Sequence, residues 1–376
     1  MATTSTVTGA QAIAALLREA GINRVYALSG NQIMALFDAF IDADIDIIHV
    51  RHEAAAVHMA DAAARLTGTP QVALVTAGPG HANAVSALFS ALSSQSPVVM
   101  LSGHSPAKNP GLGHFQELDQ ATMARPVTKA AWTPSSADTL VETVGQALAL
   151  SVSGTPGPVQ VSLPVDLLEG EAAPCAIRWA PPSATEEDAV AEVKRLLTNA
   201  ARPIIVAGPS ACRGQYWQAL TRLSARTGIA IVAAESPRGL KDPALGVYGQ
   251  CLGQADVVIL AAKEMDFTLG YGASPTIGET AVVVDIAPGE RATKINEHAS
   301  AGRIYQRLIG TPENLVEALD SGLPDATQAR SEWRAEVLEA ASFRPQQWQA
   351  LANSNAVPMH PVTVFATVTE MLADSP

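Results

Sequence analysis

Short, continuously apolar runs alternate with helical patterns along the first 170 residues, and this alternation restricts the possible folds more than any other feature. Neither set of alternate positions in the runs is consistently polar, as is typical of strands whose sheet is covered on both faces. Such strands occur in parallel sheets with helices on both sides. The predicted strands are Val25–Leu28, Ile45–Val50, Val72–Thr76, Val98–Leu101 and Val159–Leu163.

A second region with the same alternation follows a break. The break is punctuated by Pro174, Pro181 and Pro182 and shows no periodicity, as expected of a linker. We therefore predict an α/β protein of two doubly wound parallel-sheet domains. The predicted strands of the second region are 203–207, 229–233, 257–262 and 281–286. The expected segments are a first domain over 1–170, a linker over 171–186, a central domain over 187–322, a helical connector over 323–358, and the first helix of a further domain over 359–376.

Charge and composition disfavour several classes of function. The formal net charge is −12 and no run of Lys or Arg occurs, so neither nucleic acid nor a membrane is an expected partner. The longest apolar runs, such as Val257–Ala262, are far shorter than the roughly 20 residues that cross a bilayer. The N-terminus lacks the basic segment of a secretory signal, and the three cysteines are scattered. We therefore expect a cytoplasmic protein with reduced thiols.

The segment Arg51-His52-Glu53 lies between a predicted strand and the helix that follows it. Ligands of open α/β sheets bind at the carboxyl ends of the strands, so a charged side chain here faces the expected site. The helix N-terminus would stabilise the Glu53 carboxylate, whereas burial would raise its pKa, and the sequence leaves the balance open. The alternative is an acid that only caps the helix. A zinc motif is excluded, because His-Glu-x-x-His would require histidine where Ala56 stands.

A glycine-rich turn, Thr76 to Asn83, also follows a strand and opens a helix. Backbone amides in such a turn can approach a ligand closely, because glycine has no side chain. A dinucleotide fingerprint would require a third glycine at Asn83 and an acidic residue about twenty positions later. Neither is present, and no Walker A motif occurs, so the turn does not predict NAD binding.

Four motifs occur in one order over the first domain. They are Leu28-Ser29-Gly30-Asn31, Arg51-His52-Glu53-Ala54, Thr76-Ala77-Gly78-Pro79-Gly80-x-x-Asn83 and Phe115-Gln116-Glu117-x-Asp119. Together they resemble the pyrimidine-binding domain of the acetolactate synthase superfamily of thiamine-diphosphate enzymes. Benzaldehyde lyase, oxalyl-CoA decarboxylase and 2-hydroxyacyl-CoA lyase are members of that superfamily. Residues 190–320 are similar, with weaker motifs, to its central domain.

The resemblance implies that Glu53 is catalytic. In the superfamily this glutamate hydrogen-bonds the aminopyrimidine ring of thiamine diphosphate and favours the imino tautomer, which then removes the C2 proton of the thiazolium. Thr76, Gly80 and Asn83 match further cofactor-binding positions around the same ring. Gln116 matches a second catalytic position, on a wall that crosses to the site of another subunit.

The resemblance also implies a substrate pocket. Asn31 and Gln32 fall on a loop whose residues differ with substrate among the relatives. The expected pocket residues are Asn31, Gln32, His81 and Phe115. For His81, which stands at a helix start, capping or packing is an equally good interpretation.

Relatives hold FAD or ADP in the central domain, so the resemblance also raises the question of a nucleotide there. Lys263, Glu264 and Asp266 follow a predicted strand and could contact one. A solvated charged loop is the preferred interpretation of this segment. Asp285 could equally begin a turn before Pro288.

Full-length relatives bind the diphosphate and Mg²⁺ through a Gly-Asp-Gly motif and later paired asparagines, which do not occur in these residues. We therefore expect no metal ligand in this chain and expect Mg²⁺ to be bound by a partner. The expected partners are a small subunit carrying the diphosphate-binding domain and a second copy joined through the pyrimidine-binding domain. A fragment of a longer protein is the competing explanation.

The function predicted from the resemblance is that of the large subunit of a carboligase or lyase. Its reaction would make or break a carbon–carbon bond next to a carbonyl, on a small 2-oxoacid, aldehyde or acyl-CoA substrate. The alternative is a non-catalytic or regulatory nucleotide-binding subunit that retains the fold.

Overall fold

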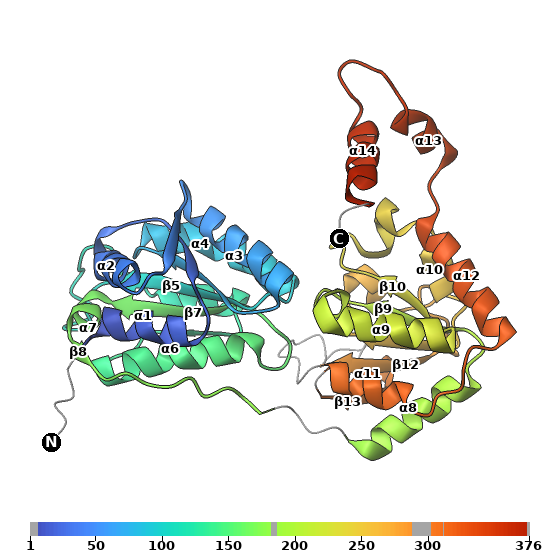
Figure 1. Cartoon of the computed structure of the whole chain (residues 1–376), viewed down its shortest axis with the longest axis horizontal. Coiled ribbons are helices and arrows are strands. Elements are labelled where there is room, and N and C mark those ends of the chain that lie inside the picture. The colour runs from blue at the N-terminus through green and yellow to red at the C-terminus, as the bar shows by residue number, and fades with distance from the viewer. Residues whose placement is uncertain (1–6, 182–185, 288–301, 311, 374–376) are drawn as a thin grey trace.

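The computed structural model describes residues 7–181, 186–287, 302–310 and 312–373 (Figure 1). Parts of the predicted linker, of the segment after Asp285 and of the last predicted helix lie outside these ranges. Within the described residues, both predicted domains contain a parallel sheet covered by helices, so the predicted fold class is confirmed.

The N-terminal domain is built on a six-stranded parallel sheet with the order β3-β2-β4-β5-β7-β6. Its strands are β2 (Arg24–Ala27), β3 (Asp46–His49), β4 (Gln71–Val75), β5 (Val98–His104), β6 (Ala130–Trp132) and β7 (Val159–Pro164). Five of these match the predicted strands. The short strand β6 was not predicted, nor was the antiparallel pair β1 (Val7–Thr8) and β8 (Glu171–Ala172).

Both faces of this sheet are buried, which explains its continuously apolar strands. In β4, Val72 and Leu74 pack on one face, whereas Ala73 and Val75 pack on the other. The first face is covered by α1 (Gly9–Glu19), α2 (Met34–Asp42), α6 (Ala137–Val152) and α7 (Val165–Glu169). The second face is covered by α3 (Glu53–Thr67), α4 (Pro79–Ser93) and α5 (Gln120–Ala124). Burial of alternate residues on opposite faces is what a strand period of two requires.

The central domain has a five-stranded parallel sheet with the order β10-β9-β11-β12-β13. Its strands are β9 (Pro203–Ala207), β10 (Ala230–Ala233), β11 (Val257–Ala261), β12 (Val282–Ala287) and β13 (Ile304–Ile309). One face is covered by α8 (Glu187–Asn199), α9 (Gly214–Thr227) and α11 (Pro312–Asp320). The other is covered by α10 (Tyr248–Leu252) and α12 (Gln328–Ser342).

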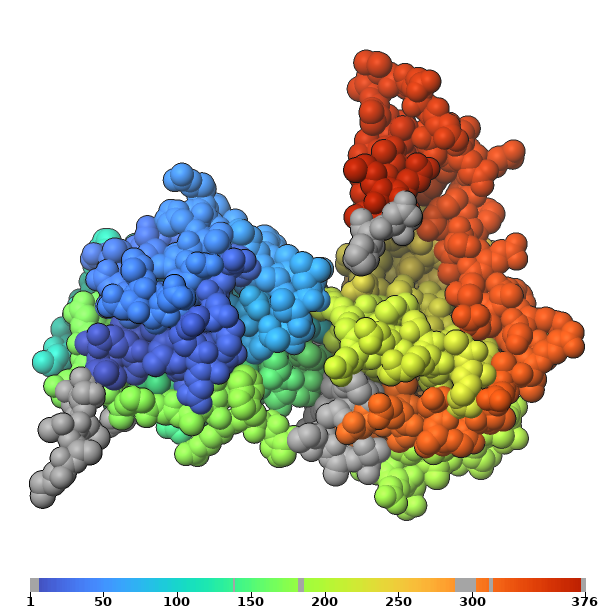
Figure 2. Space-filling view, in the orientation of Figure 1, coloured from blue at the N-terminus to red at the C-terminus, as the bar shows by residue number. Residues whose placement is uncertain are grey.

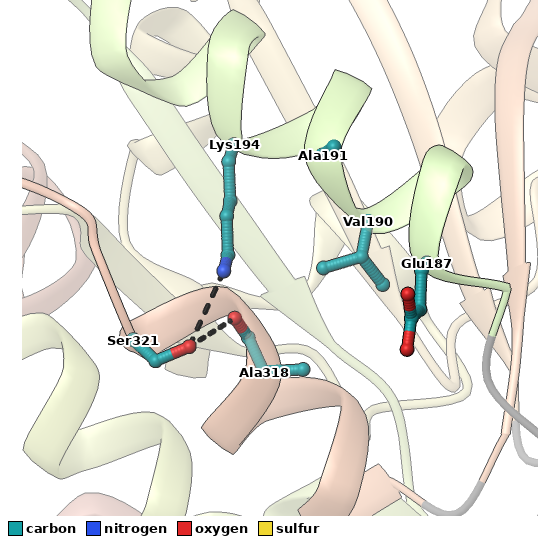
Figure 3. Close-up of a pocket in the computed structure, with 6 residues that line it drawn as sticks. All are labelled: Glu187, Val190, Ala191, Lys194, Ala318 and Ser321. Atoms are coloured by element: carbon teal, nitrogen blue, oxygen red, sulfur yellow. Dashed lines mark hydrogen bonds between the residues drawn. The ribbon is translucent and has the colours of Figure 1, made fainter.

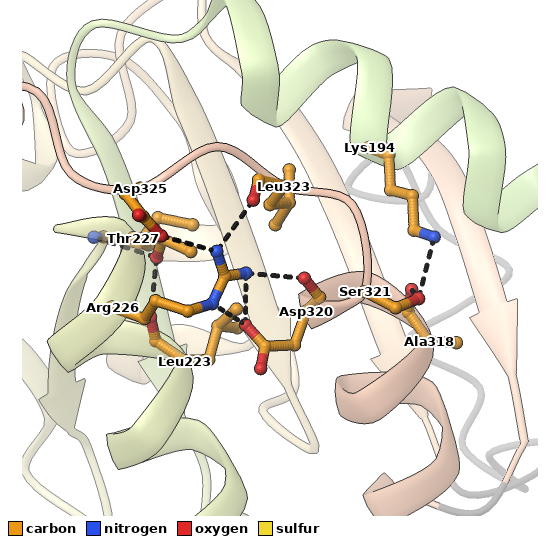
Figure 4. Close-up of polar contacts among 10 residues, drawn as sticks. Lys194, Leu223, Arg226, Thr227, Ala318, Asp320, Ser321, Leu323 and Asp325 are labelled. Carbon is orange, nitrogen blue, oxygen red and sulfur yellow. Dashed lines mark hydrogen bonds and ion pairs between the residues drawn. The ribbon is translucent and has the colours of Figure 1, made fainter.

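Helix α12 falls in the predicted connector but packs on the central sheet. Trp333 and Val337 are buried in its core, and the indole N–H of Trp333 donates to the carbonyl of Pro203 at 3.2 Å. The core of the central domain therefore extends beyond the predicted boundary at residue 322. Arg226 at the end of α9 also binds the segment that leads into α12. It donates to Asp320 Oδ1 at 2.9 Å and to the Leu323 carbonyl at 2.8 Å (Figure 4).

The last described elements stand apart from both sheets. Helices α13 (Gln346–Ala352) and α14 (Pro361–Ala373) pack on each other and project from the central domain (Figure 1). Helix α14 exposes a row of large apolar side chains, which are Val364, Phe365, Val368, Met371 and Leu372. None of the described helices combines the length and apolar character needed to cross a membrane.

Candidate active site

Glu53 is the first residue of α3, just beyond the carboxyl end of β3. The helix is capped by the preceding residue, because His52 Nδ1 accepts a hydrogen bond from the Ala54 amide at 3.1 Å. This cap satisfies one of the free amides that begin every helix. The Glu53 side chain instead meets Asn83 on α4, whose Nδ2 donates to Glu53 Oε2 at 3.0 Å. Among the described residues, none donates a hydrogen bond to Glu53 Oε1.

Two glycines allow Thr76 to pack closely beside this carboxylate. A Cβ atom at Gly80 would lie 3.4 Å from Glu53 Oε1 and 2.7 Å from Thr76 Cγ2. A Cβ atom at Gly30 would lie 2.3 Å from Thr76 Cβ. Thr76 Oγ1 in turn donates to Oε1 of the buried Gln32 at 2.7 Å. The carboxyl ends of β2, β3 and β4 thus bring five of the motif residues together.

This arrangement fits the aminopyrimidine ring of thiamine diphosphate. A flat heterocycle needs little side-chain bulk next to the group that binds it, and Gly80, without a Cβ atom, adds none beside Glu53 Oε1. It also needs a group that binds a ring nitrogen, and Glu53 Oε1 accepts no hydrogen bond from the described residues. Asn83 restrains the other carboxylate oxygen, so the orientation of the carboxylate is defined before any ligand binds.

A loop held by Glu117 lies next to the glycine turn. The Glu117 carboxylate accepts hydrogen bonds from the amides of Gly111 at 2.6 Å, Gly113 at 2.7 Å and His114 at 2.9 Å. These backbone hydrogen bonds, that of Gly111 most strongly, lower the pKa of Glu117. The carboxylate therefore closes the loop that carries the next predicted site residue, Gln116.

Gln116 contacts the turn directly. Its backbone is left-handed, with φ of 60°, and a Cβ atom at Gly78 would lie 2.8 Å from Gln116 Cβ. Gly78 is itself left-handed, with φ of 58°, a conformation that glycine adopts without a steric cost. Phe115 is 70% exposed, and Asn31 is exposed where its short 3-10 turn begins. The structure therefore places Gln116 beside the site, with Phe115 and Asn31 on the surface.

A buried polar cluster under the glycine turn was not predicted. Gln120 Oε1 accepts the Gly78 amide at 2.9 Å, and Gln120 Nε2 donates to the Gly103 carbonyl at 3.0 Å. Ser102 Oγ lies within hydrogen-bonding distance of the Gln120, Gln160 and His81 side chains. Ser162 Oγ completes the cluster, with contacts to both glutamines. The available signal was the presence of Ser102, Gln160 and Ser162 in buried strands, because a buried polar group requires a partner.

His81 belongs to this cluster. Its side chain is fully buried, and Nδ1 lies 3.0 Å from Ser102 Oγ. Its burial and its contact with Ser102 favour packing over a place in the substrate pocket. Burial lowers the pKa of His81 to about 4.

The buried histidine predicts a loss of stability in mild acid. Its pKa in the folded protein, about 4, lies below the value of 6.5 of an unperturbed histidine. Between these values the unfolded chain binds more protons, so stability rises with pH there and falls as the pH decreases from 6.5 to 4. The His81 contribution should reach roughly 3 kcal/mol. Urea unfolding of wild type and His81→Gln across this range would measure it, and an equal pH dependence in both would contradict it.

Two charged residues that follow or lie within central-domain strands, Asp285 and Lys263, are buried. Asp285 lies within β12 and is 1% exposed, with Arg307 Nε of β13 at 3.1 Å, so it does not begin a turn. Lys263 is also buried, which corrects the solvated loop expected for this segment. Asp266 Oδ1 accepts the Thr268 amide at 2.9 Å.

Neither a metal-binding cluster nor a second pocket adds to the site within the described part of the chain. No group of three or more His, Cys, Asp or Glu side chains lies there in a metal-binding arrangement. A shallow depression lies between α8 and α11, where Lys194 donates to Ser321 Oγ at 3.2 Å (Figure 3). It contains none of the predicted site residues.

The fold is that of an α/β protein with parallel sheets, and Glu53 lies beside Gly80 at the carboxyl ends of its N-terminal strands. Residues 7–123 match the family of the thiamine pyrophosphate enzyme N-terminal TPP binding domain. The chain is 32% identical over 370 residues to the acetolactate synthase large subunit IlvG of Mycobacterium tuberculosis, covering 96% of this chain and 66% of that protein. It is 30% identical over 420 residues to human 2-hydroxyacyl-CoA lyase 2, covering 98% of this chain and 65% of that protein.

A solved structure shares the fold. It is the X-ray structure of a protein from Mycobacterium smegmatis provisionally assigned as a thiamin diphosphate-dependent enzyme, with a TM-score of 0.73 and 22% identity. The match covers 86% of this chain and 64% of that one. Residues 7–123 thus match a thiamine pyrophosphate enzyme N-terminal domain, and the chain is similar over nearly its whole length to an acetolactate synthase and to a 2-hydroxyacyl-CoA lyase. It spans just under two thirds of the length of these relatives.

Proposed function

We propose that this chain supplies the activating residues of a thiamine-diphosphate-dependent carboligase or lyase. The reaction makes or breaks a carbon–carbon bond next to a carbonyl, and the substrate is a small 2-oxoacid, aldehyde or acyl-CoA. The observation that carries the proposal is the position of Glu53 Oε1 beside Gly80, with Oε2 held by Asn83. The names of the relatives, an acetolactate synthase and a hydroxyacyl-CoA lyase, support the same class of chemistry.

The residues of the site have separate tasks in this proposal. When bound, thiamine diphosphate supplies a carbon nucleophile at its thiazolium C2. Glu53 Oε1 shares a proton with the aminopyrimidine ring nitrogen and so favours the tautomer that acts as a base. Asn83 fixes the carboxylate, and Gly80 allows the ring to approach it. Thr76 and Gln32, which are hydrogen-bonded to each other, position the turn beneath the ring.

The proposal includes a second polypeptide part that binds the diphosphate and Mg²⁺. The relatives are longer than this chain, and the described residues offer no metal-binding cluster. We assign this part to a small partner subunit, or to further sequence if these residues are a piece of a longer protein. Exposed apolar side chains on α14, such as Phe365 and Met371, offer a surface for it.

The N-terminal domain also has an exposed apolar surface suited to self-association. Met59 on α3 and Phe89 on α4 are 38% and 61% exposed, and Phe115 lies on the loop beside the site. Large exposed apolar side chains on two helices that pack together, as α3 and α4 do, are typical of protein interfaces. A second copy contacting this surface would place Phe115 and Gln116 near both sites. The competing function, a non-catalytic nucleotide-binding subunit, has no observation in its favour among the described residues.

The 376-residue chain alone should bind thiamine diphosphate weakly and show no turnover. Addition of a polypeptide carrying the diphosphate-binding domain should restore both, because the cofactor then has protein at both ends. Calorimetric titration with thiamine diphosphate and assays with pyruvate, benzaldehyde and a 2-hydroxyacyl-CoA would measure this. The same polypeptide with its Gly-Asp-Gly aspartate replaced is the control. Full activity of the isolated chain would contradict the requirement for a second part.

A further inference from the structure

The central sheet has a topological switch point between β9 and β11. The chain passes from β9 to β10 on one side and returns to β11 on the other, as the order β10-β9-β11 shows. In doubly wound sheets the ligand crevice opens at this point, outside the carboxyl ends of the strands. A nucleotide held by the central domain would place a phosphate on the free amides of the turn after β9.

The turn after β9 does not fit a phosphate, because its amides are already hydrogen-bonded. The Gly208 amide donates to the Ala261 carbonyl at 2.8 Å, and the amides of Ala211 and Cys212 donate to the Gly208 carbonyl at 3.1 and 3.2 Å. Pro209 has no amide hydrogen. The remaining one, at Ser210, donates to a side chain of the N-terminal domain. The amides of this turn therefore do not support the nucleotide whose presence the resemblance left open.

That side chain is Gln95, which follows α4 and is 7% exposed. Its Oε1 accepts hydrogen bonds from the Ser210 amide at 3.1 Å and from Ser210 Oγ at 2.6 Å. Its Nε2 donates to the Ala262 carbonyl, just beyond β11, at 2.9 Å. The donors at Ser210, after β9, and the acceptor at Ala262, after β11, together fix the orientation of the Gln95 carboxamide. Gln95 therefore spans the crevice, with its oxygen where a phosphate oxygen would bind.

The backbone conformation of Gln95 is one in which glycine is usual, so the presence of a glutamine side chain there needs an explanation. Gln95 has φ of 52° and ends α4 in a Schellman motif, with its amide bonded to the Leu92 carbonyl and the Ser96 amide bonded to the Ala91 carbonyl. Glycine is preferred at this left-handed position, because other residues are strained there at a free-energy cost. The hydrogen bonds of the side chain to the central domain offset that cost.

Charged side chains surround the same contact. Arg65 on α3 hydrogen-bonds Ser94, the residue before Gln95. Arg213, at the start of α9, pairs with Glu235 at 3.2 Å. The pKa of Arg213 is lowered mainly by burial, with smaller effects from Glu235 and from Arg65 and Asp61 on α3. The ends of α3 and α4 thus meet the central domain at one place, where Figure 2 shows the two domains in contact.

We propose that the switch-point crevice of the central domain is a docking socket for the end of α4, occupied by Gln95 in place of a nucleotide phosphate. The opposite end of α4 carries Gly80 and Asn83. Docking at Gln95 therefore fixes the position of the helix that presents the cofactor surface. The central domain acts in this protein as a support for the N-terminal domain.

The test compares Gln95→Gly with Asp44→Gly in the full chain by amide hydrogen exchange. Asp44 ends α2 in the same motif, with φ of 55°, and is exposed within the N-terminal domain. Both variants remove the backbone strain of a non-glycine residue in the left-handed conformation. Only Gln95→Gly also removes hydrogen bonds to the central domain. The rate of amide exchange over residues 208–212 should increase roughly tenfold in Gln95→Gly, because one or more hydrogen bonds are lost. It should remain unchanged in Asp44→Gly. No change in Gln95→Gly would overturn the proposal.

A second measurement separates docking from nucleotide binding. ADP or FAD at millimolar concentration should leave exchange over residues 208–212 of the wild-type chain unaltered. Slower exchange there on addition of either nucleotide would show that the crevice is a nucleotide site, and the docking proposal would be wrong. Neither readout depends on thiamine diphosphate or on turnover, so these results do not bear on the proposed reaction.

Discussion

Replacement of Glu53 by glutamine is expected to lower turnover by about 10²–10⁴, or roughly 3–5 kcal/mol in activation free energy. The substitution keeps the size of the side chain and a hydrogen bond with Asn83. It removes the carboxylate that shares a proton with the aminopyrimidine nitrogen. Exchange of the thiazolium C2 proton, followed by NMR in the protein completed by its diphosphate-binding part, should decrease together with turnover.

Glu187→Gln provides a matched control. Glu187 is the first residue of α8, as Glu53 is of α3, but it lies on the surface of the central domain. Both variants remove a carboxylate from a helix N-terminus, at a cost of about 1 kcal/mol or less. Only Glu53→Gln should slow proton exchange. If exchange in Glu53→Gln stays within a few fold of wild type while its melting temperature falls, Glu53 is a structural residue and the proposed function is wrong.

Replacement of Gln120 by leucine should lower the free energy of unfolding by about 3 kcal/mol or more. Leucine has a similar volume but leaves the Gly78 amide and the Gly103 carbonyl without their partner, and each buried group left unsatisfied costs about 1–3 kcal/mol. The turn that contains Gly78 and Gly80 should also become less well fixed, because the Gly78 amide loses its hydrogen bond to Gln120. Urea unfolding followed by circular dichroism would measure the first effect, and thiamine diphosphate affinity in the completed protein the second.

Gln346→Leu is the control for that variant. Gln346 is the first residue of α13, as Gln120 is of α5, but its side chain is exposed. Its substitution should change stability by less than about 0.5 kcal/mol. A similar small change in Gln120→Leu would mean that the buried cluster does not hold the turn.

The strand pattern predicted the fold because both sheets are buried on two faces. The prediction failed for two of the four edge strands of these sheets, whereas the edge strands β3 and β10 were predicted. Strand β13 contains Tyr305, Gln306 and Arg307 and lies at a sheet edge, so its sequence lacks a continuous apolar run. Strand β6 is also an edge strand and is only three residues long. A strand with polar residues, or one of only three residues, gives no apolar run that can be told from a loop.

The site was predictable where it is local and unpredictable where it depends on distant pairs. Glu53 and the Gly78–Gly80 turn each follow a strand directly, so the rule for carboxyl ends of parallel strands places them together. The partners of Gly78 and Ser210 lie 42 and 115 residues away from them in the chain. No local pattern identifies Gln120 or Gln95 as those partners, because polar side chains find buried partners only after the domains have packed.

The contact between Gly78 and Gln116 couples two segments of this protein that a redesign would treat as separate. The two left-handed residues touch so closely that a side chain at 78 has no room, and a change of backbone at 116 would move the turn. Loop exchanges intended to widen the range of substrates would therefore alter the cofactor surface as well. Libraries that vary the two segments together should retain more working variants than libraries that vary either one alone, because beneficial changes at one segment depend on the sequence of the other.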